Sequence, residues 1–213
     1  MACNEAAGFV LLSDVVPHIV QEIRYFTTFN FVGERIDGYE EPVALMTREA
    51  ARALKTVSNE LMVKGYRLKI YDAYRPMMAV KHFIFWAIED EDIRMKPYFY
   101  PDIDKQDAFQ LGYIAKRSSH SRGSAVDLML LDMKTGKEVD MGGPFDLFGE
   151  RSHPDFSGIT DEQYANRMLL RAAMERNGFE PYECEWWHFR LADEPFPDTY
   201  FNFPVAQASV KVM

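Results

Sequence analysis

Two short segments of this chain carry the side chains best suited to bind a metal ion. His120 and Asp127 lie in the segment SSHSRGSAVD at residues 118–127, and Glu185 and His188 lie in the segment EWWH. Two imidazoles and one carboxylate form a typical catalytic zinc site, which leaves the fourth coordination position open for water. The second carboxylate, Glu185, could act on that water as a base. These residue types therefore predict a zinc hydrolase.

The first two ligands must converge although seven positions separate them. A helix would place His120 and Asp127 on one face, but Gly123 disfavours a helix. The small polar residues Ser121 and Ser124 near the glycine also disfavour a helix. We expect a turn at the histidine that leads into a strand carrying the aspartate, with the glycine letting the backbone fold back.

The third ligand must come from a neighbouring strand. Glu185 and His188 would share one face of a helix at their spacing of three residues. Trp186, Trp187 and the preceding Pro181 instead favour extended chain, so the spacing leaves this geometry open. We expect one of the two tryptophans to wall the site and the other to pack in the core.

The other three histidines have no comparable neighbours. His18, His82 and His153 stand apart from any such grouping of a carboxylate with a tryptophan pair. A lone histidine is more often a surface or hydrogen-bonded residue than a ligand. We therefore leave all three outside the metal site.

The elements that must position the ligands indicate an α+β fold. We expect strands at residues 23–28, 67–71, 125–131 and 183–191, from their β-branched, aromatic or alternating pattern. We expect helices over residues 47–62, 76–87 and 160–177. Thr47 can cap the first helix and Gly65 can end it. Thr160 and Gln163 form a capping-box pattern for the last helix, which Asn177-Gly178 should end.

Composition indicates one well-packed domain. The 213 residues are 47% hydrophobic and 27% charged, which is ordinary for a globular protein. The chain shows no repeat, low-complexity tract or linker. We expect a single domain over residues 1–213, with a mainly antiparallel sheet flanked by helices and the zinc site in a cleft.

Charge and hydropathy exclude several other classes of protein. A formal net charge of -9 argues against a nucleic-acid partner, because phosphate backbones require a basic face. No apolar run approaches the length that spans a bilayer, so we expect no membrane partner. Asp14 interrupts the only apolar patch near the N-terminus, so we expect a cytoplasmic protein. Cys3 leaves open a trimmed lipoprotein leader, and we expect both Cys3 and Cys184 to be reduced.

The two segments resemble the motifs of the VanX-type D-alanyl-D-alanine dipeptidases of vancomycin resistance, in peptidase family M15. This family, which also contains D,D-carboxypeptidases, shows S-x-H-x-x-G-x-A-x-D and E-x-W-H. The strings DAYRP at residues 72–76, IRY at 23–25 and DGY at 37–39 match the dipeptidase branch. The resemblance extends from about residue 20 to Phe203, nearly the whole chain.

The resemblance implies a role for each chemical group. It implies that one zinc ion per chain is held by His120, Asp127 and His188. It also implies that Glu185 is the catalytic base and that Arg75 stabilises the negative charge that develops on the amide oxygen. The reaction implied is hydrolysis of the dipeptide D-Ala-D-Ala to D-alanine.

The resemblance also implies the contacts with the substrate. A free ammonium group should meet a carboxylate, and a free carboxylate should meet hydrogen-bond donors. The first role falls on Asp146. The positions that would line the pocket are Ser118, Tyr25 and Tyr39.

Several alternatives remain open at this stage. A D,D-carboxypeptidase would act on longer cell-wall peptides through an open cleft, which Asp146 disfavours. A non-catalytic zinc-binding module would not need both Glu185 and Arg75. An iron oxygenase with two histidines and one carboxylate usually spaces these ligands closely and needs no such base. The sequence also leaves open a homodimer, the acceptance of other dipeptides, and a role in antibiotic resistance or ordinary wall turnover.

Overall fold

A five-stranded sheet lies at the centre of the molecule. The computed structural model describes residues 6–89 and 91–210. In order across the sheet, the strands are β2 (Val20–Gln21), β4 (Tyr66–Asp72), β5 (Ala125–Asp132), β7 (Glu185–Leu191) and β6 (Phe179–Tyr182). Strand β2 runs parallel to β4, and the other neighbours are antiparallel. A second, two-stranded antiparallel sheet pairs β1 (Phe9–Leu11) with β3 (Leu45–Thr47). The prediction of an α+β fold with a mainly antiparallel sheet is confirmed.

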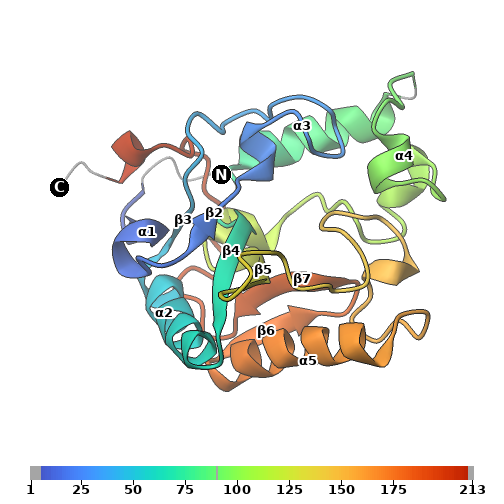
Figure 1. Cartoon of the computed structure of the whole chain (residues 1–213). Coiled ribbons are helices and arrows are strands. Elements are labelled where there is room, and N and C mark those ends of the chain that lie inside the picture. Colours follow the sequence, from blue (N-terminus) through green and yellow to red (C-terminus); the bar gives the residue numbers. More distant parts are fainter. Residues whose placement is uncertain (1–5, 90, 211–213) are drawn as a thin grey trace.

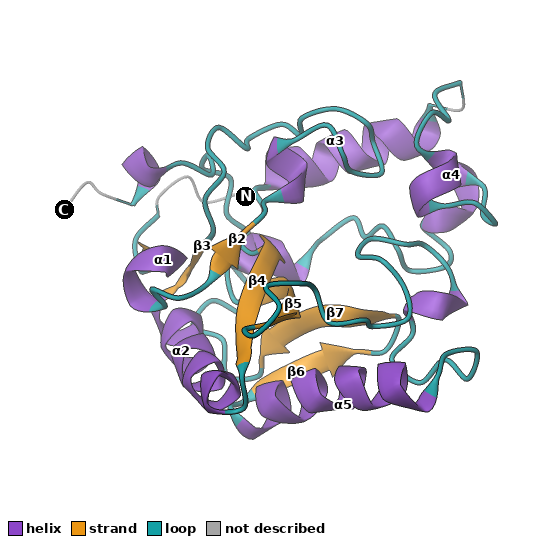
Figure 2. Ribbon diagram, in the orientation of Figure 1, coloured by secondary structure: helices purple, strands orange, loops and turns teal. Residues whose placement is uncertain are grey.

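Helices lie on both sides of the central sheet (Figures 1 and 2). The α-helices of the described residues are α1 (Leu12–Val15), α2 (Arg48–Val63), α3 (Met77–Ile88), α4 (Lys96–Phe99) and α5 (Asp161–Arg176). Helices α2 and α5 pack beside each other against the sheet, and α3 lies on its other side with α4 beyond it (Figure 1). None of these helices has both the length and the apolar character that a membrane span requires.

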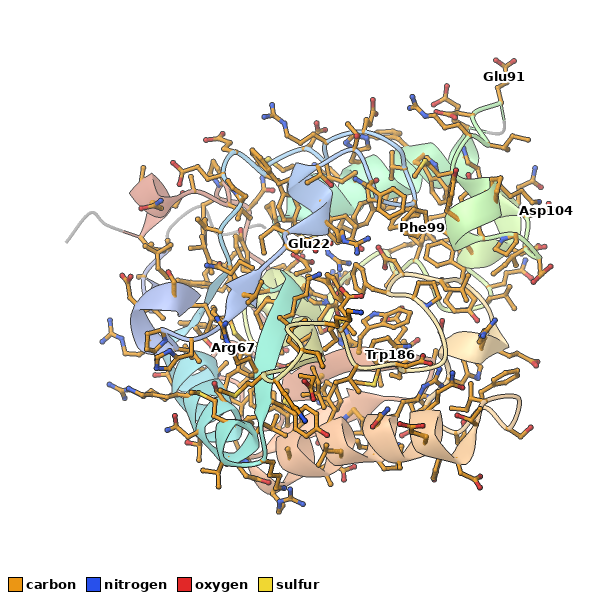
Figure 3. The ribbon with its side chains drawn as sticks, in the orientation of Figure 1. Glu22, Arg67, Glu91, Phe99, Asp104 and Trp186 are labelled. Atoms are coloured by element: carbon orange, nitrogen blue, oxygen red, sulfur yellow. The ribbon has the colours of Figure 1, made fainter. Side chains whose placement is uncertain are left out.

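The central strand explains where the core sits. The first six residues of β5, including Asp127, are all buried, since helices or loops cover both faces of this strand. Leu68 and Ile70 of β4 are also fully buried. Trp186 lies inside the molecule, whereas Asp104 projects from its edge (Figure 3). Strand β5, which carries Asp127, is therefore packed on both of its faces.

The helix boundaries largely follow the predicted caps. Helix α2 starts after Thr47, and Gly65 follows its end with a φ of +89°. The Thr47 hydroxyl, however, lies 2.7 Å from Ser124 Oγ and does not cap the helix. The capping box of Thr160 and Gln163 is present at the start of α5.

One predicted strand is wrong. Residues 23–28 form no strand, and Arg24–Phe26 instead make the 3₁₀ turn η1. The buried Asn30 explains the difference, because its amide donates to the carbonyls of Thr27 at 2.8 Å and Glu34 at 2.7 Å. Such side-chain bonds to the backbone compete with a sheet ladder and curl the segment back.

Candidate metal centre and active site

Strands β5 and β7 bring two of the predicted ligands together. Their antiparallel register pairs the Cα atoms of Asp127 and His188. Directly opposite residues project from the same face of a sheet, with Cβ atoms about 4.5–5.5 Å apart. Residues 185–188 are therefore part of a strand and not of a helix, the choice that the spacing left open.

A short turn places the other histidine. His120 lies in the 3₁₀ turn η3 (Ser119–Arg122), and Ser118 Oγ accepts a hydrogen bond from its backbone N–H at 3.3 Å. The turn ends at Gly123, whose φ is +84°. A Cβ atom there would lie 2.2 Å from the ring of Phe9, so the position requires glycine. The predicted turn leading into a strand is confirmed.

Three potential ligand atoms converge at this point. His120 Nε2 lies 3.0 Å from His188 Nδ1 and 3.3 Å from Asp127 Oδ1, and His188 Nδ1 lies 3.0 Å from the same oxygen. Tetrahedral zinc with bonds of about 2.0–2.1 Å would separate its ligand atoms by about 3.3 Å. Among the described residues, these three form the group of histidine and carboxylate side chains whose ligand atoms lie close enough together to hold one metal ion. The donor set and its spacing fit a zinc ion.

Outer hydrogen bonds orient the two imidazoles. The Nδ1 atom of His120 lies 2.6 Å from the carbonyl oxygen of Ala73, so that nitrogen carries the proton and Nε2 faces the other ligands. The Nε2 atom of His188 lies 3.2 Å from Ser119 Oγ, which leaves its Nδ1 facing inward. The two rings thus offer different nitrogens. Neither Ala73 nor Ser119 was predicted, because residue types do not show which backbone carbonyl or which hydroxyl will contact an imidazole.

The carboxylate of the ligand group is held in its charged form. Asp127 is 2% exposed, and burial alone would raise its pKa. The adjacent imidazoles of His120 and His188 instead hold the pKa of that carboxyl well below its ordinary value. A negatively charged, desolvated oxygen is therefore available for a cation.

Glu185 lies beside the ligand group at the start of β7. Its Oε2 is 3.9 Å from His188 Nδ1. The register between β6 and β7 shifts between Pro181 and Tyr182, opposite Glu185, and this irregularity lets two residues three positions apart face one site. Burial raises the pKa of Glu185 to about 8. A neighbouring cation would lower that pKa, since an opposite charge favours the ionised form.

Arg75 reaches the site from the turn between β4 and α3. Its Nε donates to Asp72 Oδ2 at 2.9 Å, and Nη2 donates to Asp127 Oδ2 at 3.4 Å. The guanidinium also lies 4.9 Å from the centre of the Tyr25 ring. This side chain is therefore a held, permanent positive charge next to the ligand group.

Asp146 also lies in the wall of this space. It is 5% exposed, and the Tyr25 hydroxyl donates to its Oδ2 at 2.8 Å. Its φ of +63° is in the left-handed region, which is uncommon for a residue other than glycine. Burial, with a smaller contribution from the charge of Asp127, raises the pKa of Asp146 to about 7. A strained backbone thus aims a desolvated carboxyl into the site.

These groups surround one cavity of about 220 Å³. Val80 and Phe83 of helix α3 and Phe31 from the loop after η1 contribute an apolar part of the wall. Ser118, with the segment 112–115, closes another side. The predicted residues that line the cavity are Tyr25, Arg75, Ser118, His120, Asp127, Asp146, Glu185 and His188. The sequence therefore selected most of one continuous site.

Two expectations about the wall do not hold. Tyr39 does not line the cavity, and its hydroxyl donates to Asp72 Oδ1 at 2.7 Å behind Arg75. Trp186 and Trp187 are both buried, and neither lines the cavity, so the expectation that one of them walls the site is wrong. Large aromatic side chains pack equally well in a core or a wall, and residue type alone does not separate the two.

Sequence reasoning also missed two features of this region. Asp72, in the DAYRP string, is 1% exposed and bonds both Arg75 and Tyr39. Tyr182 lines the cavity mouth, and its hydroxyl donates to the carbonyl of Gly112 at 3.2 Å. The three histidines left outside the metal site, His18, His82 and His153, are absent from the cavity wall.

Comparison with known proteins agrees with the geometry. The family described as D-ala-D-ala dipeptidase, in peptidase family M15, matches residues 5–206. The chain is 43% identical over 199 residues to a D-alanyl-D-alanine dipeptidase of Enterococcus faecalis, covering 93% of this chain and 98% of the relative. A relative of the same name from Enterococcus faecium is 43% identical over 198 residues, and one from Streptomyces coelicolor is 40% identical over 198 residues. Each of these two matches also covers 93% of this chain and 98% of the relative. The chain therefore belongs to the D-Ala-D-Ala dipeptidase family of peptidases.

Proposed function

We propose that this protein is a zinc-dependent dipeptidase that hydrolyses D-alanyl-D-alanine to two molecules of D-alanine. One observation carries the proposal: three ligand atoms within 3.3 Å of one another share a cavity with Glu185 and Arg75. The name of the relatives, which match over almost their whole length, supplies the substrate.

The ligand group supports zinc as the cofactor. His120, Asp127 and His188 offer two nitrogens and one oxygen, the donor set of catalytic zinc sites with an open position. When bound, zinc supplies Lewis-acid activation of water and of an amide carbonyl. We propose one such ion per chain.

Glu185 is the group placed to move protons. Its carboxylate lies 3.9 Å from His188 Nδ1 and its side chain is 15% exposed, so it can take a proton from the attacking water. The C–N bond then breaks, and the same carboxyl returns the proton to the departing amine. Because the base is regenerated in each cycle, no other buried acid is required.

Arg75 is the group placed to stabilise charge. During attack on the amide carbon, the carbonyl oxygen becomes negative, and a fixed guanidinium beside it lowers the energy of that state. Its contacts with Asp72 and with the Tyr25 ring hold it before the substrate enters. Little reorganisation is therefore needed at the moment of reaction.

The two ends of a dipeptide have separate partners. Asp146 can pair with the substrate ammonium, and this pairing favours its ionised form. Tyr25 already donates its hydroxyl proton to Asp146, so it supports that contact instead of binding the substrate carboxylate. Ser118 remains as a hydroxyl in the wall that can donate to the carboxylate.

A D,D-carboxypeptidase acting on longer wall peptides is the second candidate. Such a substrate continues beyond the nitrogen at which a dipeptide ends. The buried carboxylate of Asp146 in the cavity wall can pair with the free ammonium group of a dipeptide, and the internal nitrogen of a longer peptide lacks that charge. We therefore favour the free dipeptide. We also propose the cytoplasmic location that the sequence predicts, and Cys3, which leaves a trimmed leader open, lies outside the described residues.

The decisive experiment measures release of D-alanine by the purified protein. The substrates are D-Ala-D-Ala, D-Ala-D-lactate, L-Ala-L-Ala and a wall pentapeptide, each with and without a chelator, alongside metal analysis. We expect cleavage of D-Ala-D-Ala that chelation stops and zinc restores. Cleavage of the pentapeptide alone, or full activity with iron and a requirement for oxygen, would overturn the proposal.

A further inference from the structure

A buried aspartate lies directly behind the reactive groups. Asp72 is the last residue of β4, where the register with β5 shifts so that its Cα pairs with that of Asp127. Asp127 in turn pairs with His188. Three adjacent strands therefore present Asp72, Asp127 and His188 in one row across the sheet, and only the last two belong to the ligand group.

Both oxygens of Asp72 accept hydrogen bonds from side chains outside the ligand group. Oδ2 accepts from Arg75 Nε at 2.9 Å, and Oδ1 accepts from the Tyr39 hydroxyl at 2.7 Å. Its approach to His120 is 3.7 Å from Nδ1, the nitrogen that faces the Ala73 carbonyl. Asp72 therefore contacts residues that hold the site in place and does not contact the ligand atoms themselves.

These bonds determine how Arg75 can sit. A guanidinium is a planar fork that prefers to bind a carboxylate through two nitrogens. With Nε on Asp72, Arg75 makes a longer contact of 3.4 Å from Nη2 to Asp127 Oδ2. The guanidinium group also lies over two aromatic rings, with its central carbon 4.9 Å from the centre of the Tyr25 ring and 5.3 Å from that of Phe83.

If Arg75 paired with Asp127 in place of Asp72, it would leave the position from which it can stabilise charge. Without the charge of Asp72, the nearest carboxylate to Arg75 is the ligand Asp127. Desolvated opposite charges attract strongly, so the arginine would close onto Asp127 and leave the position that it now holds in the cavity wall. An arginine displaced by about 1 Å can cost about 100-fold in rate.

We propose that Asp72 is a positioning residue that holds Arg75 facing the cavity and prevents it from closing onto the ligand Asp127. Tyr39 fixes the other oxygen of Asp72, which gives that tyrosine a role outside the cavity wall. The inference rests on the proposed function, because it concerns the charge that Arg75 would stabilise during amide hydrolysis.

The test is a double-mutant cycle with Asp72→Asn and Arg75→Ala. Asparagine keeps the shape of the side chain and removes its charge. We expect Asp72→Asn to lower kcat for D-Ala-D-Ala about 10- to 100-fold, with KM and zinc content each within about threefold of the wild type. In the Arg75→Ala background, the same substitution should change kcat by less than about threefold, since it acts through an arginine that is gone.

Glu194→Gln is a matched control. Glu194 is also a buried carboxylate bonded to an arginine, Arg122, through contacts of 2.9 and 3.0 Å to Nε. Neither residue lines the cavity. This variant should keep kcat within about threefold of the wild type, so a general effect of neutralising a buried carboxylate is excluded.

Three outcomes would overturn the inference: unchanged kcat in Asp72→Asn, an equal loss in both backgrounds, or loss of zinc. If Asp72→Asn does not fold, Tyr39→Phe tests the same arrangement, with an expected three- to tenfold loss of kcat that vanishes in Arg75→Ala. Unchanged kcat in Tyr39→Phe would then overturn it. A wild-type protein without turnover would count against the proposed function, whereas an active wild type with additive losses counts against this inference alone.

Discussion

Two parts of the cavity wall are built in different ways: the strand end, which holds Asp127 and His188, and the loop end, which holds Asp146. At the metal-binding end, paired strands set the positions, because Asp127 and His188 are direct partners in the register of β5 and β7. At the other end, Asp146 stands on a loop with a left-handed φ of +63°. Single side-chain contacts position this loop residue, since it has no strand register to follow.

A buried arginine shows how the loop end is held. Arg167 of α5 is 1% exposed and donates to the carbonyls of Met141 and His153, both at 2.6 Å, and of Arg151 at 2.9 Å. These carbonyls flank Asp146 on both sides in the chain. A distant helix thus fastens the loop that carries Asp146, whereas strand pairing positions two of the three residues of the ligand group.

The largest effect is expected at the strand end. His188→Ala removes one of three ligands, so the protein should lose zinc and at least 10³-fold of its turnover. Zinc content after dialysis, with kcat measured on the same sample, checks this. His82→Ala is the control, because that histidine lies outside the cavity. Full zinc retention in His188→Ala would break the assignment of the ligand group.

Glu185→Ala should separate binding of the metal from chemistry. The substitution removes the base and no ligand, so zinc should stay while kcat falls about 10³-fold. The measurement pairs metal analysis with turnover of D-Ala-D-Ala. A near wild-type rate would show that another group moves the proton.

The sequence predicted the strand end better than the loop end for a physical reason. Residue types with strong metal preferences, such as His120 and His188, identify themselves, and β propensity places Asp127 on a strand. The turn at Gly123 was also predictable, because the glycine signals folded-back backbone. What the sequence did not reveal is that Asp127 and His188 are exact cross-strand partners, since register depends on the whole sheet.

The loop end depended on contacts between distant residues. Tyr25 was expected on a strand, but the polar contacts of Asn30 curl that segment. Tyr39 was expected in the wall and lies behind Arg75, on Asp72. Aromatic residues favour strands, walls and cores alike, so only tertiary packing decides among them.

Asp146→Asn should weaken substrate binding while leaving the metal end intact. The amide cannot pair with an ammonium charge, so KM should rise about 100-fold, with kcat and zinc content changed far less. Steady-state kinetics with D-Ala-D-Ala checks this split. A loss confined to kcat would place Asp146 in the chemical step instead.

The pH dependence of KM should report the same carboxyl. Burial raises the pKa of Asp146 to about 7, so below that pH the group becomes neutral and loses its attraction for the ammonium. KM should therefore rise about tenfold between pH 8 and pH 6. Asp146→Asn should remove this dependence. A KM that stays level in the wild type would contradict the assigned role.

Tyr25→Phe should produce the smallest change and the most specific one. The hydroxyl donates to Asp146 at 2.8 Å and lowers the pKa of that carboxyl by stabilising its ionised form. Without the hydroxyl the pKa rises, so the acid-side increase in KM should begin at a higher pH. At pH 8 we expect KM to increase only a fewfold. Because the Tyr25 hydroxyl bonds Asp146 and is not part of the ligand group, zinc content should not change. A shift of the profile toward lower pH would show that the hydroxyl destabilises the charged carboxyl, and the loop end would then bind the ammonium by other means.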